Sequence, residues 1–155
     1  MKLYLVQHAK AASKEVDPQR SLAEQGWRDA QKMAVFIKPL RLSVGAIWHS
    51  RKKRAAQTAE VLAGATTVTG KVTARDGLGP TDDVTPVRDE LSSSARDIMI
   101  VGHLPFLGKL ASLLLAGSEQ ADAVAFRQGG IVCLGRSEEN RWQLDWMVVP
   151  DLLTD

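Results

Sequence analysis

The stretch that decides the fold is residues 98–105, which read IMIVGHLP. The apolar run 98–101 predicts a strand covered on both faces, as in a parallel sheet that lies between helices. Pro105 suits the first turn of a helix, and an apolar helical stripe then continues until Gly117. The stretch therefore predicts a strand that passes directly into a helix, with His103 at the junction.

The same alternation of short apolar runs and helical stretches covers most of the chain, which is typical of β-α-β units. Further strands are predicted at residues 3–6, 45–48 and 68–73, and helices at 21–38, 52–62 and 85–91. The C-terminal part predicts β-structure at 124–126, 131–134 and 142–149, the last two as an antiparallel hairpin. The expected fold is a three-layer α/β/α sandwich with a mostly parallel central sheet and an antiparallel C-terminal hairpin.

Two of these helices begin with capping signals. Ser21 and Glu24 have the spacing of a capping box, in which each side chain satisfies a free backbone donor of the other residue. Thr85 is expected to cap the next helix, with Pro86 at its first helical position. The sequence therefore predicts helix starts at residues 21 and 85.

Composition describes one globular domain. The chain has 155 residues, of which 45% are hydrophobic, and 20 lysines and arginines stand against 18 aspartates and glutamates. A chain of this length can bury one core, so a single domain over residues 1–155 is expected. The net charge of +2 allows an anionic ligand but does not favour nucleic acid as a partner.

The one cysteine, Cys133, excludes an intramolecular disulfide and favours a reducing, cytoplasmic location. Its apolar neighbours indicate a small buried residue. The apolar runs 3–6 and 113–116 are too short to cross a bilayer, so we expect neither a membrane segment nor secretion.

All three histidines follow predicted parallel strands. His8 comes after the first strand, His49 after the second and His103 after the run 98–101. Ligands of open α/β sheets bind beyond the carboxyl ends of the strands. Because histidine is a common nucleophile and proton carrier in phosphoryl chemistry, these positions indicate a site at that edge.

A basic cluster opens the helix after the second strand, at residues 51–54. Arg51 and Arg54 are three residues apart on one helical face, which allows both to approach one anion, while Lys52 and Lys53 are interpreted as a solvated face. No aromatic residues are interleaved with the cluster, which argues against nucleic-acid binding. Residues 102–110 are no nucleotide-binding loop either, because the glycine spacing is one residue too long and the magnesium-binding hydroxyl is missing.

Three motifs resemble those of the histidine phosphatase superfamily, which has the phosphoglycerate mutase-like fold. They are LVQHA at 5–9, Ser50-x-x-x-Arg54-Ala55-x-Gln57-Thr58 and VGH at 101–103. Ser21-Leu22-x-x-x-Gly26 resembles the family's usual helix opening. The resemblance covers about the first 110 residues, in the family's order. The short length, Ala9, Lys10 and the run His103-Leu104-Pro105 resemble the small SixA-like phosphohistidine phosphatase branch.

The resemblance implies a role for each matching residue. His8 is the expected nucleophile, Arg54 a phosphate clamp and His103 a second histidine on the phosphate oxygens. The implied activity needs no metal and no cofactor. The expected partners are a phosphorylated protein, above all one carrying phosphohistidine, or a small phosphorylated substrate, with inorganic phosphate as product.

One departure from the family pattern concerns the residue before the nucleophile, which is Gln7 here and an arginine in the family. A charge-assisted hydrogen bond contributes about 1.5–3 kcal/mol, which corresponds to about ten- to a hundredfold in rate. Lys10, Arg20 or Arg51 could supply the missing charge. The sequence therefore leaves two alternatives open: a phosphatase weakened at Gln7, or a degenerate, non-catalytic binder of phosphate or phosphoprotein.

The general acid is the second open assignment. Asp76, Asp82 and Asp83 lie in a loop rich in turn residues, and Asp82 and Asp83 are the candidates we retain. A phosphohistidine substrate needs less acid help, because its leaving imidazole is protonated near neutral pH.

Overall fold

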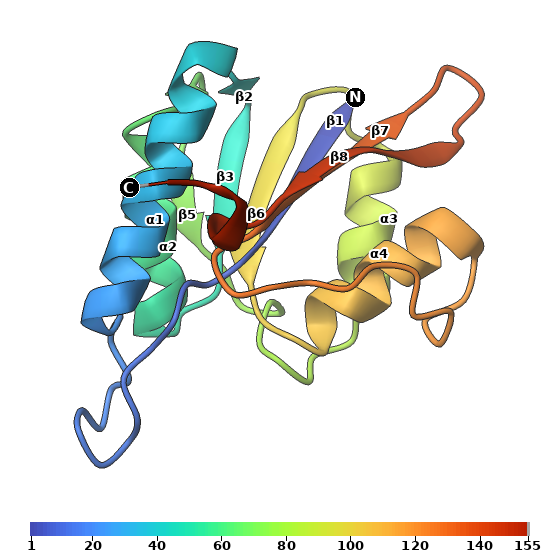
Figure 1. The fold of residues 1–155 in the computed structure, drawn as a ribbon. Helices are drawn as coiled ribbons and strands as arrows, with labels where there is room; N and C mark the ends of the chain where they lie inside the picture. Colours follow the sequence, from blue (N-terminus) through green and yellow to red (C-terminus); the bar gives the residue numbers. More distant parts are fainter. Residues whose placement is uncertain (155) are drawn as a thin grey trace.

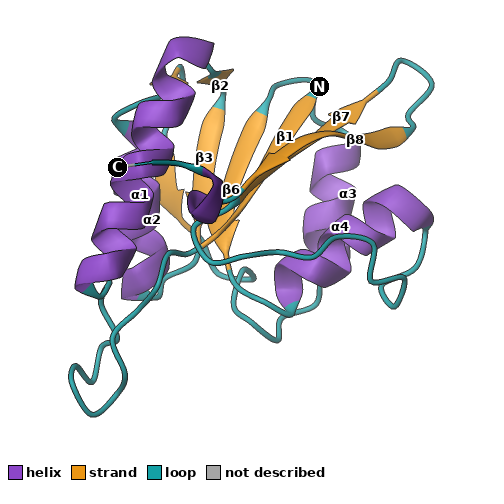
Figure 2. Cartoon of the chain, viewed as in Figure 1, coloured by secondary structure: helices purple, strands orange, loops and turns teal. Residues whose placement is uncertain are grey.

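The computed structural model describes residues 1–154 and contains a six-stranded sheet between two pairs of helices (Figures 1 and 2). The strands of this sheet, in spatial order, are β5 (Val72–Ala74), β3 (Ala46–His49), β6 (Ile98–Gly102), β1 (Lys2–Gln7), β7 (Ile131–Arg136) and β8 (Trp142–Val148). The helices are α1 (Glu24–Ile37), α2 (Lys53–Ala63), α3 (Thr85–Ser92) and α4 (Phe106–Ala116). Two 3₁₀ turns, η1 (Lys38–Leu40) and η2 (Pro150–Leu152), and a small sheet of β2 (Ser43–Val44) with β4 (Thr67–Val68) complete the fold.

The sheet has the expected mixed character. β5, β3, β6 and β1 pair in parallel, whereas β7 pairs antiparallel with both β1 and β8. Helices α1 and α2 cover one face, and α3 and α4 cover the other (Figure 2). The predicted three-layer α/β/α sandwich with a C-terminal antiparallel hairpin is confirmed.

The central strand β1 is buried on both faces because successive side chains point to opposite sides of the sheet. Leu3 and Leu5 belong to the core beneath α3 and α4, whereas Tyr4 and Val6 belong to the core beneath α1 and α2. This burial on both faces explains the continuous apolar run of the strand. It also fixes the carboxyl end of β1, which His8 follows directly.

The predicted capping box at Ser21 is wrong. α1 begins three residues later, at Glu24, with Ala23 at the N-cap and no side-chain cap. The hydroxyl of Ser21 donates to Asp17 instead, and Leu22 forms an isolated antiparallel bridge with Ala11. These contacts hold residues 21 and 22 in an extended conformation, which delays the helix.

The start of α3 is predicted correctly in place but not in its cap. Thr85 is already helical, and Val84 occupies the N-cap. The side chain that satisfies the free backbone donor of Thr85 belongs to Asp83, whose Oδ1 accepts that N–H at 3.0 Å. A carboxylate near a helix start is also favoured by the helix dipole.

The single strand predicted over 68–73 is wrong in its continuity. The segment is divided between β4, in the small sheet, and β5, at the edge of the main sheet. Gly70 lies between them, and a Cβ there would be 2.2 Å from the carbonyl oxygen of Gly45. Close passage of two backbones therefore interrupts the strand.

The strand predicted over 124–126 is also wrong, because this segment is irregular. Phe126 is 6% exposed and packs into the core beneath α3 and α4 without strand pairing.

Among residues 1–154, no helix has the length and apolar content needed to span a membrane.

Candidate active site

The carboxyl ends of three adjacent strands bring the predicted site residues together. β1, β6 and β3 are neighbours in the sheet and end on the same side, at the bottom of Figure 1. The N–H of His8 donates to the carbonyl of Gly102 at 3.0 Å, and the rings of His8 and His103 lie 5.1 Å apart between centroids. The two histidines that the motifs single out therefore face one another.

His8 is buried, 7% exposed, and its Nδ1 lies 2.7 Å from the carbonyl oxygen of Ala9. A carbonyl can only accept, so the proton resides on Nδ1 and the lone pair on Nε2. Burial lowers the pKa of His8, and the charges of Arg54 and Arg20 lower it further, against the opposing effect of the hydrogen bond to Ala9. His8 is thus a neutral imidazole with a free Nε2 at neutral pH, as a nucleophile must be.

His103 is 2% exposed, and its Nε2 lies 2.5 Å from Oγ of Ser50. Burial lowers the pKa of His103 to about 3, and neighbouring His8 and the charge of Arg54 lower it further. Its Nδ1 is buried without a hydrogen-bond partner. The ring is therefore held at one nitrogen and leaves the other available.

Arg54 lies in the first turn of α2, which begins directly after β3 and carries no acidic residue in that turn. Its Nε is buried without a partner. Burial lowers the pKa of Arg54, and the charge of Arg20 adds to the effect. Two guanidinium groups close together and a free helix start form a strongly anion-attracting environment.

Three buried side-chain atoms have no hydrogen-bond partner in the described part of the chain, and all three belong to predicted site residues. They are Oε1 of Gln7, Nε of Arg54 and Nδ1 of His103. An unsatisfied buried polar group costs about 1–3 kcal/mol, so such atoms are rare unless a ligand satisfies them. If the amide of Gln7 is turned, its NH₂ group replaces the oxygen and becomes a donor for an oxyanion.

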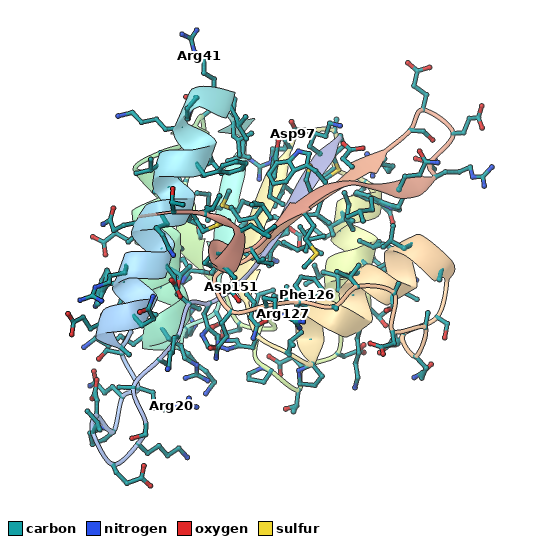
Figure 3. The ribbon with its side chains drawn as sticks, viewed as in Figure 1. Arg20, Arg41, Asp97, Phe126, Arg127 and Asp151 are labelled. Carbon is teal, nitrogen blue, oxygen red and sulfur yellow. The ribbon has the colours of Figure 1, made fainter. Side chains whose placement is uncertain are left out.

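The three cations that could replace the missing arginine lie in different surroundings. Lys10 is exposed, and Arg51 is exposed and pairs with Asp76 at 2.6 Å. Arg20 is half-buried on the segment before α1, where its Nε donates to the carbonyl of Ala12 at 3.1 Å (Figure 3). The charge of Arg20 lowers the pKa of both site histidines, whereas Arg51 and Arg54 line two different cavities.

The candidate general acids differ in what they contact. Asp83 caps α3, and its hydrogen bonds to Thr85 lower its pKa. Asp82 accepts the N–H of Gly79 at 2.7 Å and lines a cavity of about 440 Å³ that Ser50 also lines. Asp82 is therefore connected to the site through Ser50, while Asp83 accepts a hydrogen bond at the start of α3.

Among residues 1–154, no group of three histidine, cysteine or acidic side chains could hold a metal ion.

Two contacts that position the site were not assigned from the sequence. Oγ1 of Thr58 accepts the N–H of Ala9 at 3.0 Å and donates to the carbonyl of Arg54 at 2.8 Å, which ties α2 to the loop after His8. The N–H of Gly129 donates to the carbonyls of Gln7 at 2.9 Å and His8 at 3.2 Å, with φ at +77°. Thr58 stood in a quoted motif, whereas nothing in the sequence indicated Gly129.

Comparisons with known proteins bear on the family and the fold. Residues 3–79 match the family model described as histidine phosphatase superfamily (branch 1). No curated protein sequence matches the chain. Solved structures that resemble it include a protein histidine phosphatase SixA complexed with tungstate, with 23% identity, a TM-score of 0.84 and coverage of 98% of this chain and 99% of that one.

Two further structures share the fold. A putative phosphohistidine phosphatase SixA from Agrobacterium tumefaciens is 25% identical, with a TM-score of 0.76 over 96% of this chain and 97% of its own. A putative alpha-ribazole-5'-P phosphatase from Escherichia coli is 15% identical, with a TM-score of 0.74 over 97% and 98%. With the motif residues assembled at the carboxyl edge of the same fold, the chain belongs to the histidine phosphatase superfamily.

Proposed function

We propose that the protein hydrolyses a phosphorylated substrate, above all phosphohistidine in a protein, through a covalent phosphohistidine intermediate on His8. Family membership supports a phosphatase in general. The observation that carries the mechanism is the set of partnerless buried atoms on Gln7, Arg54 and His103 around a neutral His8. A tetrahedral oxyanion would accept hydrogen bonds from Nε of Arg54 and Nδ1 of His103, and from the NH₂ group of Gln7 when its amide is turned.

In the first step, Nε2 of His8 attacks phosphorus and a phosphorus–nitrogen bond forms. The bond from phosphorus to the leaving group breaks, and the leaving group takes up a proton. Nδ1 of His8 keeps its proton on the carbonyl of Ala9, which stabilises the positive charge that develops on the ring. Arg54 and His103 hold the equatorial oxygens, where phosphoryl transfer needs charge most.

In the second step, water attacks the phosphorus atom that is bound to Nε2 of His8, and a phosphorus–oxygen bond forms. The phosphorus–nitrogen bond breaks, inorganic phosphate leaves and the imidazole is restored. The ring of His103, 5.1 Å away, is close enough to act on the same phosphoryl oxygens in both steps. These steps use imidazole and guanidinium groups and call for no metal ion.

We further propose that Arg20 replaces the charge that Gln7 does not supply. Arg20 is the candidate whose charge reaches His8, His103 and Arg54 together. Its backbone has a φ of +50°, a conformation that non-glycine residues rarely adopt, and its Nε is fixed on Ala12. A guanidinium held in this way is oriented for an anion rather than free in solvent.

Phosphohistidine is the favoured substrate because the site offers little acid help. Asp82 is the candidate proton donor, and its carboxylate is engaged by the backbone of Gly79. The imidazole that leaves a phosphohistidine takes its proton near neutral pH, whereas the alkoxide that leaves a serine or sugar phosphate needs a strong donor.

We also propose a reducing, cytoplasmic location for the protein. The buried free thiol of Cys133 supports this proposal.

The test is turnover of a phosphohistidine peptide and of p-nitrophenyl phosphate, with and without EDTA, by the wild type and by the His8→Ala variant. We expect phosphate release from the peptide by the wild type, an acid-labile phosphoenzyme in rapid-quench samples, and loss of both in the variant. No release from either substrate would contradict the enzyme. Tungstate binding without turnover would then support the alternative, a non-catalytic phosphate binder that has lost activity through Gln7.

A further inference from the structure

A cationic cavity lies beside the site on the side of Arg54. Its volume is about 290 Å³, and its walls come from the segment before α1, the first turn of α2 and Pro80. None of the eight residues that line it is acidic, and five of them are cations: Lys14, Arg20, Lys52, Lys53 and Arg54.

These five cations differ from three arginines elsewhere in the molecule. Arg28, Arg75 and Arg88 each pair with a carboxylate at 2.6 Å. Within residues 1–154, no ion pair joins any of the five cavity cations to a carboxylate. Lys53 contacts only the neutral amide oxygen of Gln19, at 3.3 Å. Unpaired like charges around one hollow repel one another, so the cavity favours binding of an anion.

The nearest carboxylate does not fill this role. Asp17 is near enough for the charge of Lys53 to lower its pKa, but hydrogen bonds from Ser21 and Gln19 have the larger effect and hold it outside the lining. Arg54 meanwhile connects the cavity to the site, because its guanidinium lines the cavity and its charge lowers the pKa of both histidines.

We propose that this cavity binds a second anionic group of the substrate while the phosphoryl group lies between His8 and His103. The inference rests on the proposed phosphatase function and narrows its substrate class to molecules with two anionic groups. Lysine ammonium groups are point charges that accept carboxylate or phosphate alike. The second group is therefore either an acidic side chain flanking the phosphorylated residue or a second phosphate of a small substrate. Lys52 and Lys53, which the sequence indicated as a solvated face, contribute to this cavity.

The experiment compares two matched substrate pairs. One pair is a phosphohistidine peptide with glutamates on both sides and the same peptide with glutamines. The other pair is 1,3-propanediol bisphosphate and propyl phosphate. At low salt we expect about a tenfold preference in kcat/KM for the doubly anionic member of one pair, which shrinks at 0.3 M salt. The pair that shows the preference identifies the source of the second anion.

The variants Lys14→Gln and Lys53→Gln, alone and combined, test the location. Each is expected to reduce the preference about two- to fivefold through the KM of the doubly anionic substrate. Lys38→Gln is the matched control, because Lys38 is an exposed lysine in η1, outside the cavity lining. Because both substrates of a pair meet the same enzyme, a partly unfolded variant would not change the ratio.

Turnover without any preference in either pair would overturn the inference and leave the phosphatase intact. If the wild type turns over no substrate, the same pairs are compared by binding, using fluorescence anisotropy for labelled peptides and calorimetry for the small phosphates. Preferred binding of a doubly anionic member that Lys53→Gln removes would then support the cavity without the enzyme. Equal binding within both pairs would overturn it.

Discussion

Two arginines at opposite ends of the molecule show how differently its polar groups are used. Arg136, on β7, donates from Nη1 to the carbonyl of Leu91 at 2.6 Å and from Nη2 to the carbonyl of Ser94, and it lies 5.5 Å from the ring centroid of Trp142. Arg54, at the start of α2, has a buried Nε with no partner. The first guanidinium is satisfied by the protein, and the second is left for a ligand.

The same contrast extends to the surroundings. Near the hairpin, Lys2 pairs with Asp145 and fixes β1 to β8. At the carboxyl edge, Arg20 and Arg54 lie close enough for one charge to lower the pKa of the other guanidinium. Local rules that favour stability are followed at one end and broken at the other, which is typical of a functional site.

The largest effect should come from truncating each arginine. Arg54→Ala is expected to lower kcat/KM about a hundred- to a thousandfold, since two charge-assisted hydrogen bonds are worth about 3–4 kcal/mol together. Its melting temperature should stay the same or rise, because a buried unpaired donor is removed. Steady-state kinetics and thermal unfolding measure the two effects.

Arg136→Ala should behave in the opposite way. Loss of the contacts at the end of α3 is expected to cost about 2 kcal/mol, or roughly 4–8 °C in melting temperature, with kcat/KM per folded molecule unchanged. If Arg54→Ala destabilised the protein and Arg136→Ala inactivated it, the assignment of Arg136 to stability and of Arg54 to ligand binding would be contradicted.

The next effect concerns the absent arginine. Gln7→Arg is expected to raise kcat/KM about ten- to a hundredfold, because a charge-assisted contact replaces a neutral one. Gln7→Lys is the matched control and should gain less, since an ammonium cannot form a bidentate clamp. Equal rates for wild type and Gln7→Arg would mean that the clamp is already complete.

A smaller effect is expected at Arg20. Arg20→Gln should lower kcat/KM about tenfold in the wild-type background and less in the Gln7→Arg background, because the two guanidinium groups would then do the same work. Arg28→Gln, which removes an exposed charge paired with Glu24, should change the rate less than twofold. Additive effects of Gln7→Arg and Arg20→Gln would show that Arg20 acts independently of position 7.

The last prediction concerns the pH dependence of stability, which bears on the two site histidines rather than on the arginines. The pKa of His103 falls from 6.5 to about 3 on folding. Between these two pH values, His103 is therefore protonated in the unfolded chain and neutral in the folded chain. The free energy of unfolding should therefore decrease as the pH falls from 6.5 towards 3, by up to about 1.4 kcal/mol per pH unit. His8 acts in the same direction, because its pKa is lowered too.

Melting temperatures at pH 7, 6 and 5 check this prediction. His103→Gln removes the titrating group and should lose less stability on acidification than the wild type. Identical pH slopes in the two proteins would show that the acid sensitivity comes from elsewhere in the molecule.

What the sequence predicts well is whatever depends on neighbouring residues. The apolar run 98–101 leads into β6, and the motif histidines, His8 and His103, do meet at adjacent strand ends. Competition between side chains explains the error at the start of α1. The hydroxyl of Ser21 donates to Asp17 instead of capping the helix, and α1 begins three residues further on. Whether a cation lies near Gln7 depends on how residues 10–20 fold back, which is set by contacts such as Arg20 with Ala12.

The single hydrogen-bond donor of Gly129 also has a consequence for the order in which the protein becomes active. It holds the carbonyls of both Gln7 and His8, although it lies 121 residues after His8. A ribosome that has released the first 110 residues has delivered all three motifs, but His8, the proposed nucleophile, still lacks this support. Activity should therefore appear during synthesis only when the last quarter of the chain has emerged and closed over the start.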